Sequence, residues 1–448
     1  MSHFMKSSKA PWFIPMALSL FLAACGPATE FYRNVDTSVA GHDFAAAIAD
    51  VRAHQGDYGE KATVLYKLDL GLLYHYAGQP DSSNRWFFAA EKEIDDLYTK
   101  SVSLAAASML LNDNVLPYEG EDVEKVLINA FLALNYVEKG EPDEALVEAR
   151  KVDEKLRVYA KEYEGKNTYK EDAFIRYLMG VLYESRGEIN DAYISYKKAY
   201  ETYAVYTKDY GTRAPSFLLD DLVRTATLMA FDDDAEHFRS LGGKPFGREH
   251  GDDGSVIVLA YAGKGPIKQE YRPTVSIPDE KGVIHTFQVA LPKFVPRSKP
   301  GRSYVIEVAA GDSTRLPQVR TEVVEDVNAI AAKTLEDRMT LVYLKSGGRA
   351  LLKFLASEKA KSTISKKNDD VLTNLLGSLA VDIAVGATEK ADVRAWRTLP
   401  AEFQMARVNI PAGSYAVRIA STDGAVRREE KVVVRKGKTT FVIVDDVR

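Results

Sequence analysis

One pattern of small and aromatic residues occurs three times between residues 70 and 199 of this 448-residue chain. In each window a large-small pair is followed three positions later by tyrosine, four positions after that by glycine, and then by small residues. The pairs are Leu70-Gly71, Leu132-Ala133 and Met179-Gly180, and the glycines are Gly78, Gly140 and Gly187. Glycine ends a helix readily, and small side chains let two helices approach closely. The pattern therefore predicts stacked helix pairs.

These windows are similar to the tetratricopeptide (TPR) repeat, whose regular period is 34 residues. With Gly41 taken as a fourth turn glycine, the steps between turns are 37, 62 and 47 residues. The unequal steps, and a polar insertion at 112–124, predict an irregular TPR-like α-solenoid over residues 41–240. Such solenoids expose extended surfaces suited to binding other proteins.

A second unit follows a loop-rich linker at 241–254, which carries clustered glycine and aspartate. Short apolar or alternating runs separated by turn residues then predict strands. We expect them at 255–261, 274–277, 283–291, 303–309, 406–410, 414–421, 425–434 and 439–444. The predicted fold is therefore α+β and multidomain, with a sandwich-like, β-rich domain at 255–448. Helices are expected to be inserted around 322–388, one of them at 371–387.

The single cysteine of the chain, Cys25, ends the sequence Leu22-Ala-Ala-Cys25. Lys6 and Lys9 and a mostly apolar run precede it, an order typical of a secretory signal. This sequence resembles the lipobox of bacterial lipoproteins, which implies a signal peptide at 1–24, acylation of Cys25 and a tether at 25–40. Gly26, rather than aspartate, resembles the pattern of lipoproteins sorted to the outer membrane.

Charge and hydropathy exclude several partners. The formal net charge is −5, and removal of residues 1–24 makes the mature chain more acidic, which argues against nucleic acid. No later segment reaches the roughly 20 apolar residues needed to span a bilayer. With Cys25 acylated, no disulfide within the chain is possible.

Two further motifs, Pro117–Asp122 and Ala391–Pro400, accompany the repeats and the lipobox. Together these features resemble a family of bacterial outer-membrane lipoproteins with TPR-like repeats and no assigned activity. The resemblance implies an envelope location facing the periplasm, and it supplies no catalytic residue and no cofactor.

Several polar clusters are candidates for a catalytic or metal site, but for each we prefer a structural interpretation. They are the carboxylates Glu119, Glu121, Asp122 and Glu124; Asp232–Asp234 with Glu236 and His237; His250 with Asp252 and Asp253; Ser195 with Lys198; and Trp396 with Arg394 and Arg397. Acidic residues suit the start of a helix, whose partial positive charge they complement. We therefore predict no catalytic residue and no metal site.

Tyrosines are concentrated in the last repeat, where Tyr193, Tyr196, Tyr200 and Tyr203 recur at helix-face spacings. They either extend the packing between repeats or form a groove that contacts a partner, since tyrosine is common in binding faces. The function predicted is a lipid-anchored envelope scaffold or adaptor, not an enzyme, that binds a protein partner through its repeats. The alternatives are a regulator of peptidoglycan synthesis or outer-membrane assembly that touches glycan, and an enzyme with an unsignalled site.

Overall fold

A computed structural model describes residues 31–108, 116–244, 253–278, 284–298, 303–310, 318–339 and 390–448, with a few isolated positions between these ranges. The predicted signal peptide, Cys25, His250 and the predicted helix at 371–387 lie outside the described residues. Among the described residues, no helix combines the length and the apolar character that crossing a membrane requires.

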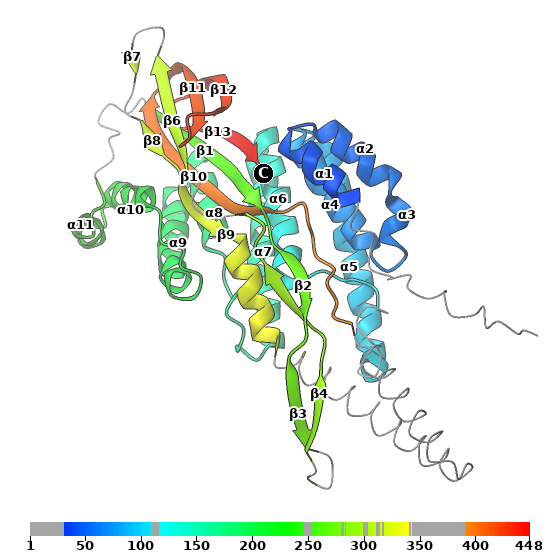
Figure 1. Ribbon diagram of the computed structural model, residues 1–448. Helices are drawn as coiled ribbons and strands as arrows, with labels where there is room; N and C mark the ends of the chain where they lie inside the picture. The colour runs from blue at the N-terminus through cyan, green and yellow to red at the C-terminus, as the bar shows by residue number, and fades with distance from the viewer. Residues whose placement is uncertain are drawn as a thin grey trace, which may run out of the picture.

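Ten helices before residue 245 form five antiparallel pairs, arranged in a row that runs from α1 to α11 (Figure 1). The pairs are α1 (Phe31–Ala40) with α2 (Phe44–Ala53), α4 (Thr63–Tyr76) with α5 (Pro80–Ser108), α6 (Asp122–Lys139) with α7 (Pro142–Glu162), α8 (Ala173–Ser185) with α9 (Ile189–Asp209), and α10 (Ser216–Leu228) with α11 (Asp232–Ser240). A single extra turn, α3 (Gln55–Tyr58), follows the first pair. The TPR-like helical array predicted from the sequence is therefore present.

All five pairs are joined by the same turn. In each, one residue has a positive φ, and the next N–H donates to the carbonyl five residues before it at 2.8–3.0 Å. This arrangement is the Schellman motif that commonly ends a helix. The positive-φ residues are His42, Gly78, Gly140, Gly187 and Ala230.

The prediction of a first turn at Gly41 is wrong, because the residue with the positive φ is His42. No repeat was predicted beyond the one with Gly187, because the turn of the fifth pair carries Ala230 and no glycine. The tether predicted at 25–40 is helix α1 from Phe31 onward, and its first residues are buried.

The β-rich unit contains two packed sheets. The first has the order β13-β1-β10-β9, and the second has the order β12-β11-β6-β7 with β8 also paired to β6. Their strands are β1 (Asp253–Lys264), β6 (Tyr304–Ala310), β7 (Thr314–Arg315), β8 (Val319–Arg320), β9 (Glu322–Asp326), β10 (Pro400–Pro411), β11 (Gly413–Ser421), β12 (Val426–Val434) and β13 (Thr439–Asp446). The sandwich-like unit is thus built from strands on both sides of residues 340–389, most of which lie outside the described part of the chain.

A two-stranded ribbon extends from this unit (Figure 1). It pairs β2 (Ile267–Tyr271) with β5 (Leu291–Val295), and β3 (Thr274–Pro278) with β4 (Ile284–Gln288). The helical segment predicted to begin near 322 begins later: 322–326 is strand β9, and a helix follows at 327–339. The backbone of 322–326 pairs with β10, and this long-range pairing outweighs the helical spacing of its apolar residues.

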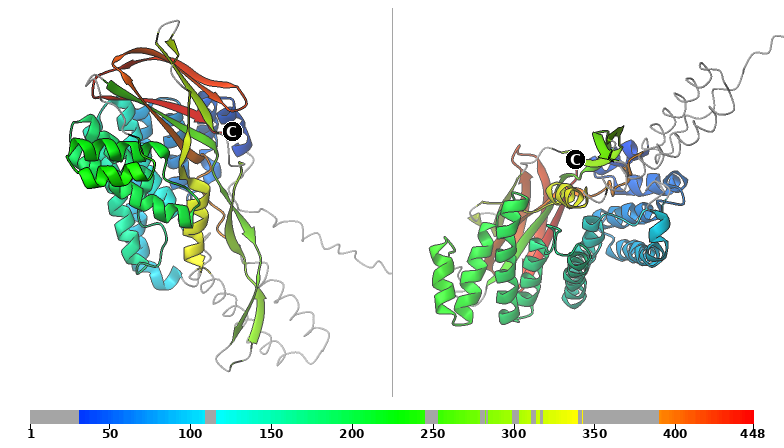
Figure 2. Two further views of the ribbon diagram at one scale, coloured as in Figure 1. Left: turned by 90° about the vertical axis from the view of Figure 1, so that its left-hand side faces the viewer. Right: turned by 90° about the horizontal axis from the view of Figure 1, so that it is seen from below.

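The first sheet is buried on both faces. Along β1, Val256, Val258 and Ala260 face the core between the two sheets. The alternate residues, Ile257 and Tyr261 among them, belong to the core of the helices, as the period-two alternation of a strand requires. The sheet therefore lies directly against the row of helices, and both views of Figure 2 show the strands along one side of it.

Candidate functional site

The first helices of the last four pairs, α4, α6, α8 and α10, together form one face of the solenoid. We call it the first-helix face. Residues Asp122–Asn135 of α6 are all buried except Lys125, although a helix at a solvated surface keeps one polar stripe exposed. The C-terminal unit covers this face, so its side chains form a seam between the two parts of the chain.

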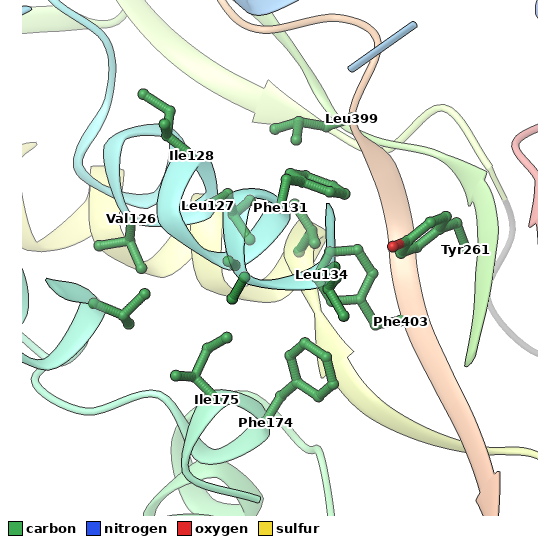
Figure 3. Close-up of a cluster of buried hydrophobic side chains, with 14 of the residues drawn as sticks. Val126, Leu127, Ile128, Phe131, Leu134, Phe174, Ile175, Tyr261, Leu399 and Phe403 are labelled. Carbon is green, nitrogen blue, oxygen red and sulfur yellow. The ribbon is translucent and has the colours of Figure 1, made fainter. Parts of the chain in front are cut away.

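The middle of the seam is aromatic. The ring centroid of Phe131 of α6 lies 5.7 Å from that of Tyr261 of β1 and 5.6 Å from that of Phe403 of β10 (Figure 3). It lies 5.9 Å from the ring centroid of Trp396. Such edge-to-face rings add stabilisation beyond the area they bury. Trp396 is 1% exposed and also packs on Phe87, so it anchors the C-terminal unit to the helices. From the sequence we expected instead an anchor at the edge of the sandwich.

Buried polar contacts join the first repeats to the C-terminal unit. His75 of α4 lies 2.8 Å from the Tyr261 hydroxyl through Nε2 and 2.6 Å from Asn135 Oδ1 through Nδ1. Asp69, also on α4, accepts from the hydroxyl of Thr398 at 2.8 Å, and from Tyr32 and Tyr58 at 2.6 and 2.7 Å. Burial raises the pKa of the Asp69 carboxyl, while the three hydroxyl donors oppose that rise.

An ion cluster joins the last repeats to strand β10. Arg407 donates to Glu184 Oε2 at 3.0 Å, to Asp221 Oδ2 at 2.8 Å and to the hydroxyl of Tyr196 at 3.1 Å. Arg224 pairs with both carboxylates from the other side. Burial disfavours the charged carboxylate of Glu184, but Arg407 and Arg224 outweigh this and hold its pKa at about 2.

A small pocket, with about 20 Å³ of space for water, opens beside this cluster. Its lining includes the cations Arg224, Arg407 and Lys438 and the carboxylates Glu184 and Asp253. Lys438 Nζ donates to the carbonyl of Ser185 at 2.9 Å, so it bridges the turn before β13 and the end of α8. Arg407 and Lys438 in this lining hold the two parts of the chain together.

The carboxylate cluster at the start of α6 is divided between two structural roles. Glu121 forms ion pairs with Lys268 at 2.6 Å and with Arg338 at 2.8 Å. Burial disfavours the charged carboxylate of Glu121, but these cations outweigh burial and lower its pKa to about 2. Glu124 accepts from the Tyr118 hydroxyl and from the backbone N–H groups of Glu121 and Trp396. Burial, and then the charge of Glu121, raise the pKa of Glu124 to about 7.

Glu121 and Glu124 also form a capping box at the start of α6. This is the helix-start interpretation preferred from the sequence, with contacts to the C-terminal unit that the sequence did not reveal. Glu119 is half-buried beside it, and Asp122 accepts from the hydroxyl of Tyr163 at 2.6 Å.

The tyrosines of α9 lie in the packing positions of the repeat. When α7 and α9 are aligned by their turns, three tyrosines of α9 take the positions of smaller or aliphatic residues of α7. Tyr193, Tyr196 and Tyr203 correspond to Leu146, Ala149 and Leu156. Tyr196 and Tyr203 have no exposed surface, and Tyr203 donates to the carbonyl of Val324 at 3.0 Å. This burial argues against the predicted contact of these two side chains with a partner.

The other two tyrosines pack at the end of the array. Tyr193 is 5% exposed and contacts Phe231, and the half-buried Tyr200 lies edge-on to Phe238 at 5.8 Å. A comparison of α9 with α7, position by position, could have identified three of the four as core residues from the sequence.

Within the described part of the chain, the remaining candidate clusters do not come together into a site, and His250 and Asp252 of one cluster lie outside it. Asp232–Asp234 form the first turn of α11, with Glu236 and His237 on the same short helix. Ser195 is buried on α9 and Lys198 exposed. Arg394 donates to the carbonyls of Lys61 and Leu116, which ties the segment before Trp396 to the chain just before α4 and before α6.

Comparison with known proteins gives no family. No family model matches the chain, and no curated protein matches it. Among solved structures, the chain is similar over 49% of its length to BtubC (BKLC) from P. vanneervenii, at 16% identity, 83% coverage of that chain and a TM-score of 0.33. MamA AMB-1 matches over 49% of this chain and 94% of its own, at 16% identity and a TM-score of 0.29. A Podosopora anserina protein with nearly identical TPR-like repeats matches over 47% and 90%, at 11% identity and a TM-score of 0.30.

Proposed function

We propose that this chain is a non-catalytic scaffold, anchored by acylated Cys25 in a bacterial envelope membrane, that binds a protein partner on the outer side of its repeats. The location follows the lipobox-like sequence Leu22-Ala-Ala-Cys25. The outer side is the part of the solenoid that the C-terminal unit leaves uncovered.

The observation that carries this proposal is a repeated exposed pattern on the second helices. On α7, Val147 and Val158 are 50% and 41% exposed, and on α9, Ile194 and Val205 are 42% and 48% exposed. The two pairs occupy the same positions of successive repeats. Single exposed apolar residues are ordinary, but recurrence at matched positions is expected of a surface used by a repeat array.

The polar residues between them are repeated as well. Lys151 and Glu154 stand between the valines of α7, and Lys198 and Glu201 stand at the matched positions of α9. At i, i+4, i+7 and i+11, each set of four residues shares one side of its helix. We call these two sets the outer stripes. A partner that fits them would present apolar side chains flanked by both signs of charge.

Site-specific photocrosslinking in the native envelope tests the proposal. A photoreactive residue at Val147 or Ile194 is expected to capture the same protein, because both positions belong to matched stripes. Val433 on β12, which is 60% exposed and outside the repeats, is the control position. Equal capture from Val433, or no adduct from either stripe with several crosslinker lengths, would contradict the proposal.

The anchor is tested separately. Cys25→Ser is expected to release the protein from the membrane fraction, because acyl chains supply the attachment. Membrane association that survives this substitution and resists high salt would contradict the lipid anchor.

A further inference from the structure

The first helix of the described chain is fixed firmly to the body of the protein. Phe31 and Tyr32 of α1 are 4% and 2% exposed, and the Phe31 ring lies 5.2 Å from His54 and 5.3 Å from Tyr58. The Tyr32 hydroxyl donates to the buried Asp69, and the Arg397 guanidinium lies 4.6 Å from the Tyr32 ring centroid. The start of α1 is therefore part of the core and marks a definite point on the molecule.

That point is close to Cys25 along the chain. Six residue steps separate Cys25 from Phe31, and a fully extended chain covers about 20 Å in six steps. Helix α5 alone, with 29 residues, has a length of roughly 43 Å. The connection is thus shorter than the body it holds, so it restricts which side of the protein can reach the membrane.

We propose that the end of the molecule formed by the start of α1, by α3 and by the loop at 59–61 lies against the lipid headgroup surface. We call it the membrane-proximal end. This inference rests on the proposed acylation of Cys25 and adds an orientation to it. The occupant of this surface is the bilayer in which the acyl chains are inserted.

The charges at the membrane-proximal end give little reason to expect attraction to anionic lipid, so the covalent tether is what positions this end at the membrane. Its exposed charged residues are of both signs: Arg33, Arg52, Asp57, Glu60 and Lys61. A nearly balanced set adds little attraction to an anionic leaflet, which needs a polybasic cluster. The covalent connection therefore dominates the orientation.

The orientation places the rest of the array away from the bilayer. Helix α11 lies at the opposite end of the row from α3 (Figure 1). The outer stripes on α7 and α9 lie between these ends, where a protein of the surrounding compartment can reach them.

Short-range fluorescence quenching in vesicles tests this orientation. The acylated full-length protein is reconstituted into phosphatidylethanolamine–phosphatidylglycerol vesicles that carry a nitroxide on the lipid headgroup. Because Cys25 is the only cysteine and its thiol is consumed by acylation, a single introduced cysteine takes the fluorophore alone. Glu60→Cys marks the membrane-proximal end, and Glu236→Cys on α11 is the matched exposed control.

We expect quenching at least severalfold stronger at position 60 than at position 236. Insertion of 20 Gly/Ser residues after Pro27 lengthens the connection, and it is expected to reduce the difference between the two positions while acylation is unchanged. Equal quenching in the protein without the insertion, or stronger quenching at 236, would overturn the orientation. Vesicle flotation separates this result from failure of the anchor, since a protein that does not float with the vesicles contradicts the acylation itself.

Discussion

Gly180 of α8 lies directly beneath the ring of Tyr196 of α9, so close that a Cβ on this glycine would be 2.4 Å from the ring carbons. Gly71 and Phe87 repeat the arrangement in the second helix pair, at 2.6 Å. The equivalent residues of the third pair are Ala133 and Ala149, both fully buried. The first helix thus carries the smaller residue wherever the second carries an aromatic ring, which explains the large-small pair of the sequence pattern.

This size matching predicts a rescue. Gly71→Ala should destabilise the protein by about 1–3 kcal/mol, because the new methyl group overlaps the Phe87 ring. Phe87→Ala should cost about 3–5 kcal/mol through the cavity it leaves. The double variant recreates the alanine pair of the third helix pair. Its loss of unfolding free energy should therefore be clearly smaller than the sum of the losses of the two single variants. Denaturant unfolding of all four chains measures this, and strict additivity would show that the two positions do not share one space.

Arg407 is expected to hold the C-terminal unit to the last two repeats. Arg407→Met removes one of the two cations and leaves two buried carboxylates, Glu184 and Asp221, with Arg224 alone. The predicted loss of unfolding free energy is about 3–5 kcal/mol. Arg157→Met, which removes an exposed pair with Glu154 on α7, is the control and should change the stability little. Similar stabilities for the two variants would contradict a structural role for the Arg407 cluster.

The sequence predicted the parts of this fold that depend on local spacing. The turns at Gly78, Gly140 and Gly187 and the strand from Ser255 follow from glycine positions and apolar runs, and these predictions are confirmed. The turn at Ala230 carries no glycine, and strand β9 depends on pairing with a strand far along the chain. Neither leaves a local signal.

The seam was not predictable for a related reason. Arg407, Tyr261 and Trp396 lie 130 to 272 residues from their partners on the first helices. The only sign of this covering in the sequence is that α6 is apolar around most of its circumference, which indicates a helix buried on all sides. The tyrosines of α9 were open to two interpretations because a binding groove and a packed core use the same residue type.

Glu124 should make the stability depend on pH. Its pKa is about 7 in the folded chain and near the ordinary value of 4.5 in the unfolded chain, so the folded state holds this proton more tightly. The resulting stabilisation is complete below pH 4.5 and is lost as the pH rises to about 7, by about 2–3 kcal/mol. Glu124→Gln should lower the stability overall and reduce this slope. An unchanged slope between pH 4.5 and 7 in the variant would contradict the assignment.

The fifth turn offers a stabilising substitution. Ala230 is exposed and has φ 55°, a conformation that glycine adopts without the steric cost of a Cβ. Ala230→Gly should therefore raise the unfolding free energy by about 0.5–1 kcal/mol. Ala204→Gly, at an exposed position inside α9, is the opposite control and should lower it by about 1 kcal/mol. A loss of stability from Ala230→Gly would indicate that this turn differs from the other four.

The central claim is that the first-helix face is filled by the chain's own sheet, so that the repeats and the C-terminal unit unfold together. Equilibrium unfolding of residues 26–448 with Trp86→Phe leaves Trp396 as the single tryptophan, which reports directly on the seam. Its fluorescence and the helical circular dichroism signal are predicted to change in one coincident transition. Exposure of Trp396 at lower denaturant, with the helical signal intact, would show that the sheet can leave the repeats and would contradict the account.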